Sequence, residues 1–269
     1  MTVEAYAKVN LTLEVLGRRV DGYHALRSVV AAVSLADTVS IEPAETLTSD
    51  VVYADDLCLR AARTLDPMRG ASIRVTKRIP AGGGLGGGSA DAAATLRGLN
   101  ELWSLGHSAE ELAEIGARVG SDVPAQVLGG LVRMEGRGEF VSSLPFVPLH
   151  LVLANPGVHS STREVFAACR ARPSSDSRVF DEMASALVTG DPVRVAAALV
   201  NDLEEPAVRL HPEIGYALAR LRASGVLGAA MSGSGSTVFG IVRSGEEAAR
   251  IAGALASEGL RAWAVRTVA

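Results

Sequence analysis

Six of the seven residues from position 82 to position 88 are glycine, and this run constrains the fold more than any other segment. It lies in RIPAGGGLGGGSADAAATLRGLN, residues 78–100, between a strand-like stretch and an alanine-rich stretch. Each glycine that is ordered in regular structure costs roughly 0.5–1 kcal/mol relative to alanine. We therefore expect the loop to hold its backbone close to another group, where side chains would be in the way.

The alanine-rich stretch predicts a helix that begins near Ser89. Its apolar residues Ala92, Leu96 and Leu99 recur at helical spacing. The N-terminus of a helix has free N–H groups and the positive end of the helix dipole, so it is a common anion site. Glycines allow backbone N–H groups to surround phosphate oxygens. We predict a phosphate-binding loop rather than a flexible linker, with Ser89 or Asp91 capping the helix.

Three familiar nucleotide-binding patterns do not explain this loop. No lysine follows the glycines, which excludes the Walker A pattern. Gly82, Gly84 and Gly87 match the G-x-G-x-x-G of dinucleotide-binding folds, but a second helix is predicted over residues 108–119 where that fold needs a strand. The catalytic and magnesium-loop signatures of protein kinases are also missing.

Composition excludes several classes of function. The net charge of −4 argues against a nucleic-acid partner. The N-terminal segment lacks the pattern of a signal peptide, and no apolar run reaches the ~18 residues of a membrane span. We therefore expect a cytoplasmic protein with no membrane partner. In that reducing compartment Cys58 and Cys169 are expected to be free thiols.

The remaining pattern is that of a mixed α and β protein. Strands are predicted over residues 3–16 and 26–43, in the stretch that ends at Pro80, in LHLVLANPG, on both sides of the glycine loop in GAAMSGSGSTVFGIVR, and over residues 260–268. Further helices are predicted near residues 57–65, 178–189, 191–200, 211–224 and 246–258. Residues 172–177 have the composition of a linker, and two halves are expected to meet near 145–150.

The segment PAGGGLGGGSADAAA, residues 80–94, resembles the central motif of the GHMP small-molecule kinases. Residues 5–26 and 231–241 match the first and third motifs of that family in order and spacing. GSDVPAQVLGG, NPGVHSSTREVF and NDLEEPAV add three further matches. The resemblance covers essentially the whole chain. Within the family it is close to the kinases of the non-mevalonate isoprenoid pathway.

The resemblance implies an α/β fold of the two-domain, α+β GHMP kinase type. Its parts would be an N-terminal, ATP-binding and catalytic domain at residues 1–148 and a C-terminal, ferredoxin-like domain at residues 149–269. It implies transfer of the γ-phosphoryl of ATP, with Mg²⁺, to the 2-hydroxyl of a cytidine-diphospho methylerythritol. The protein is expected to act as a monomer or a homodimer.

The resemblance also assigns the glycine loop to ATP. The implied nucleotide-binding residues are Pro80, Ala81, Gly82, Gly83, Gly84, Leu85, Gly86, Gly87, Gly88, Ser89 and Ala90. Many members have two serines before the aspartate of this motif, whereas this chain has Ser89 followed by Ala90. The residue that meets the metal is left unassigned for this reason.

Asp122 and Lys8 are the implied catalytic pair. Asp122 precedes Val-Pro in a tight turn, and the residues alone weigh helix N-cap and catalytic base equally. Lys8 is the only lysine in the first 70 residues, and its strand pattern alone favours an exposed charge. The resemblance brings Lys8 beside Asp122, where it would hold the aspartate ionised and polarise the acceptor hydroxyl.

The implied substrate-binding residues are Asn10, Tyr23, His24, Thr162 and Phe166. Asn10 shares a strand face with Lys8. By the resemblance, the Tyr23–His24 segment and Phe166 hold a cytosine ring between them, and Thr162 lines the same pocket.

Two points are left open by the residues. Gly233, Ser234 and Gly235 form either a hairpin turn or a turn near the phosphates. Another GHMP kinase, such as a homoserine kinase, is the alternative assignment. A nucleotide-binding domain without catalysis is less consistent with the presence of both Lys8 and Asp122.

Overall fold

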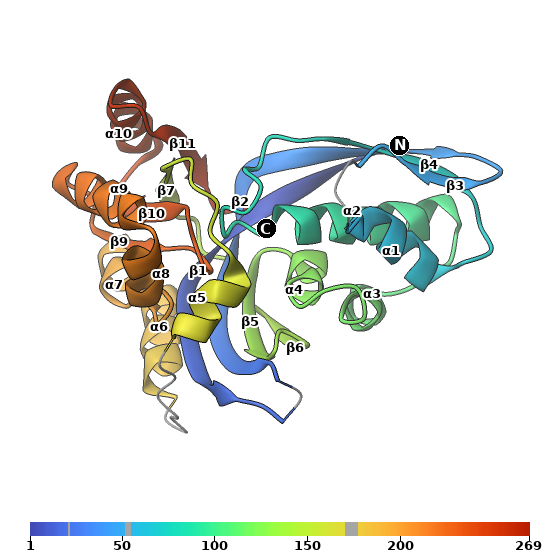
Figure 1. Cartoon of the computed structure of the whole chain (residues 1–269), viewed down its shortest axis with the longest axis horizontal. Helices are drawn as coiled ribbons and strands as arrows, with labels where there is room; N and C mark the ends of the chain where they lie inside the picture. Colours follow the sequence, from blue (N-terminus) through green and yellow to red (C-terminus); the bar gives the residue numbers. More distant parts are fainter. Residues whose placement is uncertain (21, 52–54, 170–176) are drawn as a thin grey trace.

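The computed structural model describes residues 1–20, 22–51, 55–169 and 177–269. Its backbone forms two β-sheets that lie side by side, each covered by helices (Figure 1). The predicted linker at 172–177 lies outside the described residues except for Ser177. No helix in the described part of the chain is long and apolar enough to cross a bilayer.

Two long strands form the spine of the larger, seven-stranded sheet. They are β1 (Thr2–Arg18) and β2 (His24–Pro43), paired antiparallel. The edge beyond β2 is built by β4 (Ala71–Thr76) and β3 (Leu47–Ser49), and β2 also pairs with β5 (Leu131–Gly136) of a hairpin completed by β6 (Phe140–Leu144). The alternation of apolar residues predicted β1, β2 and β4.

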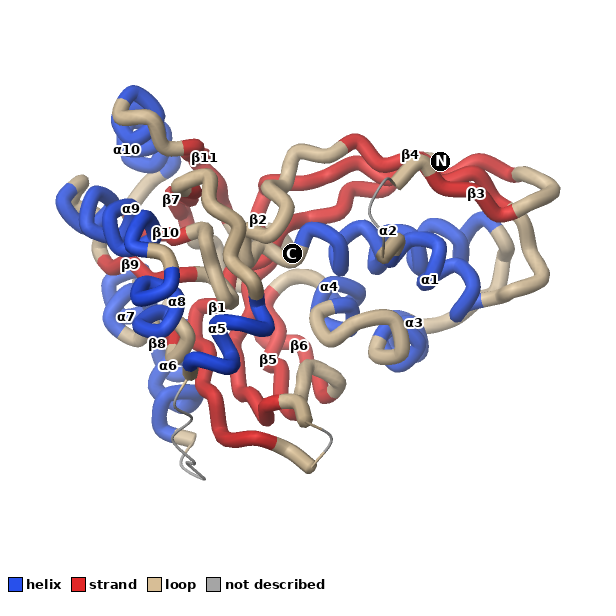
Figure 2. The backbone as a smooth tube through the Cα atoms, viewed as in Figure 1, coloured by secondary structure: helices blue, strands red, loops and turns tan. Residues whose placement is uncertain are grey.

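Four helices cover one face of this sheet (Figure 2). They are α1 (Leu57–Leu65), α2 (Gly87–Leu102), α3 (Ala109–Gly116) and α4 (Val123–Leu128). Small buried residues of α2, such as Ala90 and Ala94, pack with Val9 and Leu11 of β1 in the largest core cluster. These small side chains bring the helix backbone close to the sheet, which fixes the position of its N-terminus.

The second sheet is antiparallel throughout and has the order β11-β7-β10-β9. Its strands are β7 (His150–Asn155), β9 (Gly228–Met231), β10 (Val238–Val242) and β11 (Arg261–Arg266). Helices join them: α5 (Thr162–Ala168), α6 (Arg178–Thr189), α7 (Pro192–Ala197), α8 (Glu204–Leu210), α9 (Pro212–Ala223) and α10 (Gly245–Ser257). This is the ferredoxin-like order that was predicted.

The C-terminal half also completes the first sheet. Strand β8 (Val200–Asn201) pairs in parallel with β1, and Val268 donates a backbone hydrogen bond to Ala32 of β2 at 3.1 Å. Figure 1 shows the C-terminus in the middle of the molecule, beside α2 and α4. The two halves are therefore joined along β1 and β2.

The predicted N-cap of α2 is wrong. Helix α2 begins at Gly87, two residues before Ser89, and its N-cap is Gly86 in the left-handed conformation with φ +67°. Neither Ser89 nor Asp91 caps it, because both lie inside the helix. A glycine N-cap in this conformation leaves the first N–H groups of α2 free of side-chain acceptors.

Candidate active site

Two features of the structure require glycine in this loop: a left-handed backbone conformation and a close contact with another segment. Gly82, Gly84 and Gly86 have φ values of +63°, +74° and +67°, which other residues rarely adopt. A Cβ on Gly84 would lie 2.1 Å from the carbonyl oxygen of Ser232. The loop is therefore held against another backbone segment, and its glycines are needed there even without a ligand.

That segment is the predicted third motif. The hydroxyl of Ser232 donates to the carbonyl oxygen of Gly84 at 2.8 Å, and the N–H of Thr237 donates to Gly83 at 3.0 Å. Both Gly233 and Ser234 line the same cavity as the loop. The sequence alone allowed either a hairpin turn or a turn near the phosphates. In the structure the turn links β9 to β10 and also borders the glycine loop.

A cavity of about 410 Å³ opens in front of the loop and of the α2 N-terminus. Nearly all of the predicted nucleotide-binding residues line it: Pro80, Ala81, Gly82, Gly83, Gly84, Leu85, Gly86, Gly87, Gly88 and Ser89. Ala90 differs, because it is buried and lines a separate cavity behind the helix. Free N–H groups and an open cavity at one helix N-terminus can hold an anion.

Lys8 is buried at the floor of this cavity, only 4% exposed. Its ammonium group donates to Oδ1 of Asn10 at 2.5 Å, and Nδ2 of Asn10 donates to the hydroxyl of Ser28 at 2.8 Å. The amide of Asn10 is thus oriented with its oxygen toward the lysine. The exposed-charge interpretation of Lys8 is excluded by this burial.

Asp122 lies 3.6 Å from Lys8, measured from Oδ2 to Nζ. It occupies the N-cap position of α4, ahead of Pro124, but its side chain makes no capping hydrogen bond. Its side chain is 34% exposed. The carboxylate is therefore directed to a buried cation and to open space rather than to the helix it precedes.

A second cavity, of about 980 Å³, meets the first at Asp122. Ser89, Thr162 and Phe166 also line both cavities. Tyr23 and His24 line the second one only. The geometry therefore offers two compartments that share one carboxylate, with the glycine loop on one side and the aromatic residues on the other.

The aromatic residues do not form a slot with Tyr23 on one side and Phe166 on the other. The ring of His24 stacks on Phe166 with centroids 5.1 Å apart and an interplanar angle of 24°. Tyr23 is half exposed, and the guanidinium of Arg137 lies over its ring at 5.4 Å. Thr162 is tied to the third motif through a 2.9 Å hydrogen bond with the hydroxyl of Ser234.

Sequence reasoning missed a buried charge cluster beside the glycine loop. Lys77 makes hydrogen bonds to Asp37 and, at 2.6 Å, to Oδ2 of Asp91. Asp37 is fully buried and also accepts the backbone N–H of Ile79 at 2.8 Å. The cluster joins β2, the segment entering the loop and α2, so it ties the loop to the sheet and to the helix.

The cluster shifts the pKa values of its members. Burial raises the pKa of Asp91 to about 6, although the hydrogen bond from Lys77 opposes the shift. Burial alone would lower the pKa of Lys77, but the hydrogen bonds to Asp37 and Asp91 outweigh it and raise that pKa. No local pattern predicted this cluster, because the three side chains come from separate elements.

Three arginines in the second cavity were also missed. Arg18, Arg137 and Arg163 line the cavity together with the aromatic residues. Each comes from a different segment: Arg18 ends β1, Arg137 follows β5 and Arg163 lies in α5. Their gathering makes this compartment cationic, which suits an anionic group.

The oxygen donors near the shared carboxylate fit a magnesium ion that is held mainly by phosphates. Ser89 and Asp122 line both cavities, while no cluster of three His, Cys, Asp or Glu that could hold a metal occurs among the described residues. Mg²⁺ usually takes one or two carboxylates, substrate phosphates and several waters. One hydroxyl and one carboxylate are compatible with that arrangement.

Two models of known protein families match the chain. The model described as GHMP kinases N terminal domain matches residues 53–130, and the model described as GHMP kinases C terminal matches residues 183–261. Together they cover more than half of the chain. The first includes the glycine loop and Asp122, and the second includes the third motif.

Full-length relatives are similar as well. The chain is 43% identical over 286 residues to the 4-diphosphocytidyl-2-C-methyl-D-erythritol kinase of Symbiobacterium thermophilum, with 100% of both chains covered. A solved 4-(cytidine 5'-diphospho)-2C-methyl-D-erythritol kinase is 37% identical, with a TM-score of 0.86 over 100% of both chains. A homoserine kinase from Cytophaga hutchinsonii has a TM-score of 0.76 with 19% identity, covering 100% of this chain and 94% of that chain. Its likeness extends to the fold alone.

Proposed function

The chain belongs to the GHMP kinases and, within them, to the 4-diphosphocytidyl-2-C-methyl-D-erythritol kinases, and we propose that it phosphorylates the 2-hydroxyl of that cytidine-diphospho compound with ATP. It is a phosphotransferase of isoprenoid biosynthesis that uses ATP. The observation that carries the assignment of the acceptor is the meeting of two cavities at Asp122, one beside the glycine loop and one beside the aromatic residues.

We propose that the N-terminal domain, residues 1–148, contributes the phosphate loop and the catalytic pair, and that the C-terminal domain, residues 149–269, completes both compartments. Ser232 and Ser234 from the C-terminal part border the loop and the acceptor side. All of these residues belong to one chain, so either a monomer or a homodimer supplies a whole site. Two free thiols, Cys58 and Cys169, suit a cytoplasmic enzyme.

The phosphates of ATP are proposed to bind at the N-terminus of α2. Phosphoryl transfer demands mostly positioning and stabilisation of charge. The free N–H groups after Gly86 and the helix dipole supply both, in a cavity that the third motif closes from the other side. The Lys77 cluster keeps this loop in place and does not reach the acceptor-side cavity.

Asp122 is proposed to orient the acceptor hydroxyl and to accept its proton. Its carboxylate is not engaged in capping, and it lies 3.6 Å from Lys8. The ammonium group of Lys8 is held by Asn10, so its charge is directed at the point where the two cavities meet. There it stabilises the carboxylate and the oxygen that attacks the γ-phosphorus.

The acceptor is proposed to enter through the larger cavity. The stacked rings of His24 and Phe166 and the exposed ring of Tyr23 offer aromatic faces to a cytosine base. Base stacking on an aromatic side chain contributes about 1–3 kcal/mol. The arginines at positions 18, 137 and 163 suit the diphosphate of the same acceptor. Thr162 lies between the compartments, close to the reacting groups.

Magnesium is proposed to be held by the phosphates of ATP with Ser89 and Asp122 nearby. When bound, the ion neutralises charge that develops on the transferring phosphoryl group. The carboxylate of Asp122 would then lie near two cations, the ammonium group of Lys8 and the magnesium ion.

A coupled assay of ADP release tests the proposal. The cytidine-diphospho acceptor, its uridine analogue, free methylerythritol phosphate and homoserine are compared at equal concentration. We expect strong preference for the cytidine compound, because a site that pairs with the edge of one base leaves polar groups unpaired with another. Equal use of acceptors with and without the cytidine group would reject this acceptor, and preference for homoserine would support the alternative GHMP activity.

A further inference from the structure

The motif NDLEEPAV, residues 201–208, lies outside both cavities of the candidate active site. Its first residue, Asn201, belongs to β8 and donates two hydrogen bonds from Nδ2. One goes to the carbonyl oxygen of Met231 at 2.7 Å and the other to that of Gly233 at 2.9 Å. Oδ1 of Asn201 accepts the backbone N–H of Leu203 at 2.9 Å, which fixes the orientation of the amide. Asn201 therefore holds the turn between β9 and β10 at two points.

This turn has a backbone that needs such support. It contains two glycines in the left-handed conformation, Gly233 with φ +57° and Gly235 with φ +84°. Glycines on both sides of Ser234 allow the peptide planes between them to rotate at little cost. Ser160 donates its hydroxyl to the carbonyl oxygen of Ser234 at 2.6 Å, and Asn201 holds the carbonyl before it. The carbonyls of Gly233 and Ser234 are therefore directed by side chains.

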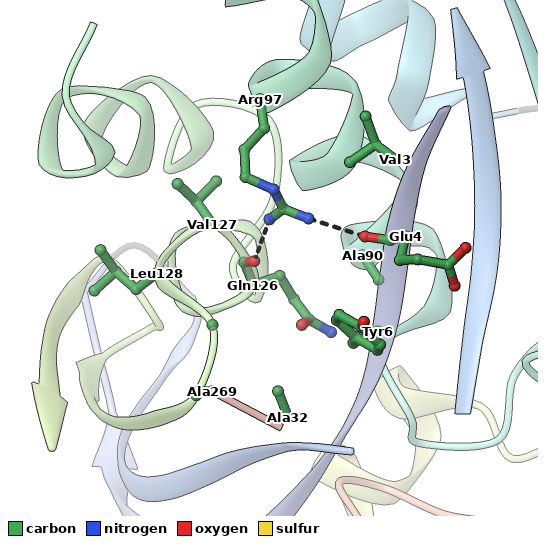
Figure 3. Close-up of a pocket in the computed structure, with 12 residues that line it drawn as sticks. Val3, Glu4, Tyr6, Ala32, Ala90, Arg97, Gln126, Val127, Leu128 and Ala269 are labelled. Atoms are coloured by element: carbon green, nitrogen blue, oxygen red, sulfur yellow. Dashed lines mark hydrogen bonds between the residues drawn. The ribbon is translucent and has the colours of Figure 1, made fainter. Parts of the chain in front are cut away.

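A bridge between two backbone carbonyls also occurs at Arg97, with a different consequence. Arg97 of α2 donates to the carbonyl oxygens of Gln126 at 2.8 Å and of Glu4 at 3.1 Å, as Figure 3 shows. Those two carbonyls belong to α4 and β1, whose regular backbone geometry already sets their direction. Gly233 lies in a turn, so the hydrogen bond from Asn201 decides where its carbonyl points.

The position of this carbonyl fixes an N–H group at the same time. The peptide between Gly233 and Ser234 is trans, so its C=O and N–H point in opposite directions. Because the C=O points to Asn201, the N–H of Ser234 points away from it. Gly233 and Ser234 line the nucleotide cavity, whereas Asn201 does not. In the described part of the chain this N–H donates to no other group.

The turn lies against the proposed catalytic pair. A Cβ on Gly233 would be 3.4 Å from Nζ of Lys8 and 3.0 Å from the carbonyl oxygen of Gly84. The hydroxyl of Ser234 is hydrogen-bonded to Thr162, which lines both cavities. A backbone donor at this place is next to the region where the phosphoryl group passes from ATP to its acceptor.

The same segment is fastened to the strand that carries Lys8. Strand β8 pairs with β1, and the backbone N–H of Asp202 donates to Leu13 at 2.9 Å. Oδ2 of Asp202 accepts the backbone N–H of Val15 at 2.8 Å. Asp202 therefore ties the segment to β1, and Asn201 ties the turn to the segment. These two neighbours form a matched pair for substitution.

We propose that Asn201 is a positioning residue for phosphoryl transfer, because it directs the N–H of Ser234 at an oxygen of the transferring phosphoryl group. This inference rests on the proposed function. In the transfer the acceptor oxygen bonds to the γ-phosphorus, the bond from that phosphorus to the bridging oxygen of ADP breaks, and the acceptor proton passes to Asp122. The N–H of Ser234 keeps its own proton and stabilises the charge on the phosphoryl oxygens.

Replacement of Asn201 by alanine tests this role. Loss of one preorganised donor lowers kcat by about 10²–10³, and a misdirected donor loses part of that effect, so we expect a fall of about tenfold to a hundredfold. The KM of the acceptor and the affinity for a non-hydrolysable ATP analogue should stay within about twofold of wild type. ADP with aluminium fluoride resembles the transferring phosphoryl group, and its binding should weaken by the same factor as kcat.

Asp202→Ala is the control, because it loosens the same segment without touching the turn. It should lower the urea midpoint of unfolding as Asn201→Ala does, and it should keep the wild-type kcat. Equal losses of kcat in the two variants would show that Asn201 has a structural role only. If ATP-analogue affinity and kcat fall by the same factor in Asn201→Ala, the contact stabilises bound ATP rather than the transition state, and the proposal is rejected.

A measurement on the wild-type protein does not depend on how the variants fold. The amide signal of Ser234 is followed by NMR in the complex with ADP and the acceptor, before and after aluminium fluoride is added. It should move downfield, because the N–H then donates to a charged group. An unchanged signal would overturn the proposal.

Failure of the assigned acceptor is a separate result. It appears as low ADP release by the wild type with the cytidine compound. The comparison of Asn201→Ala with Asp202→Ala is then made with the acceptor that the wild type uses. Normal use of the cytidine compound by wild type and by Asn201→Ala alike would reject the role of Asn201 and leave the proposed function intact.

Discussion

Asp122 stands at the start of α4 without capping it, and this separates two roles that the sequence could not distinguish. A capping aspartate hydrogen-bonds the N–H groups of its own helix, as Asp191 does when it accepts from Val193 at 2.9 Å. Asp122 is instead paired with a buried lysine from β1. The two residues are far apart in the chain, so only the resemblance of the motifs indicated that they meet.

Replacement of Asp122 by asparagine tests the proposed base. The change keeps size and removes the charge, so kcat should fall by about 10²–10⁴, the usual contribution of a positioned base. ATP affinity, measured by calorimetry, should change little. Asp191→Asn is the matched control, because asparagine also serves as an N-cap. Equal, small effects of the two replacements on kcat would exclude Asp122 from the mechanism.

Asp91 gives a prediction about pH. Its pKa is about 6 in the folded protein and near its ordinary value, about 4, in the unfolded chain. Between these values the folded protein binds the additional proton, so this group contributes stability at low pH that is lost as pH rises through about 6. The free energy of unfolding in urea is compared for wild type and Asp91→Asn from pH 4 to pH 7. The advantage of the wild type should shrink as pH rises, and a constant or growing advantage would contradict the shift.

Helix α2 and its glycine loop act as one element. Gly86 needs its left-handed conformation, whereas Gly88 has ordinary helical φ, and its Cβ would meet only Cδ1 of Leu57 at 3.4 Å. Gly86 is therefore required by the backbone conformation, whereas Gly88 leaves the cavity in front of the helix open. This difference allows loss of stability to be separated from loss of nucleotide binding.

A pair of alanine variants makes that separation. Gly86→Ala should lower the free energy of unfolding by about 1–2 kcal/mol, because alanine is strained at positive φ. Gly88→Ala should leave stability unchanged or slightly higher. It should nevertheless weaken ATP about tenfold, since its methyl group enters the space in front of the helix. Urea unfolding and calorimetry measure the two effects, and wild-type ATP affinity in Gly88→Ala would show that phosphate does not lie there.

Elements with a strong period could be predicted from the sequence, and those defined by tertiary contacts could not. The alternation in β1 and β2 and the helical spacing in α1 and α2 identified these elements. The hairpin β5–β6 and the short helices α5 and α8 were missed. Strand β8 has only two residues and exists because it pairs with β1. A seven-residue helix such as α5 carries too few residues to display a period.

The same limit applies to the site. The glycine loop was recognised because its composition is local. The Lys77 cluster was not, since its carboxylates come from β2 and α2. The His24–Phe166 stack joins residues that are far apart in the chain, and the resemblance suggested only that both meet the base. Contacts of this kind are set by the packing of the two sheets.

At the scale of the whole molecule, the phosphate loop is completed from the C-terminal half. Asn155 ends β7, is 3% exposed, and donates from Nδ2 to the hydroxyl of Thr237 at 2.9 Å. Thr237 in turn donates its backbone N–H to Gly83. Asn155 is absent from the lining of the nucleotide cavity, yet it holds the turn that presses on the loop. It therefore offers a way to disturb the loop from outside.

Asn155→Ala should lower both stability and nucleotide affinity, and a control at Asn100 separates the two effects. The side chain of Asn100 also makes two hydrogen bonds, both with the backbone of His107. It lies at the end of α2 that is far from the phosphate loop. Each alanine replacement should cost about 1–3 kcal/mol of unfolding free energy, because buried groups at Asn155 and partly buried groups at Asn100 lose their partners. ATP affinity by calorimetry should fall only in Asn155→Ala, because only there does the third motif loosen from the loop. Equal ATP affinities in the two variants would mean that the loop keeps its shape without support from the C-terminal half.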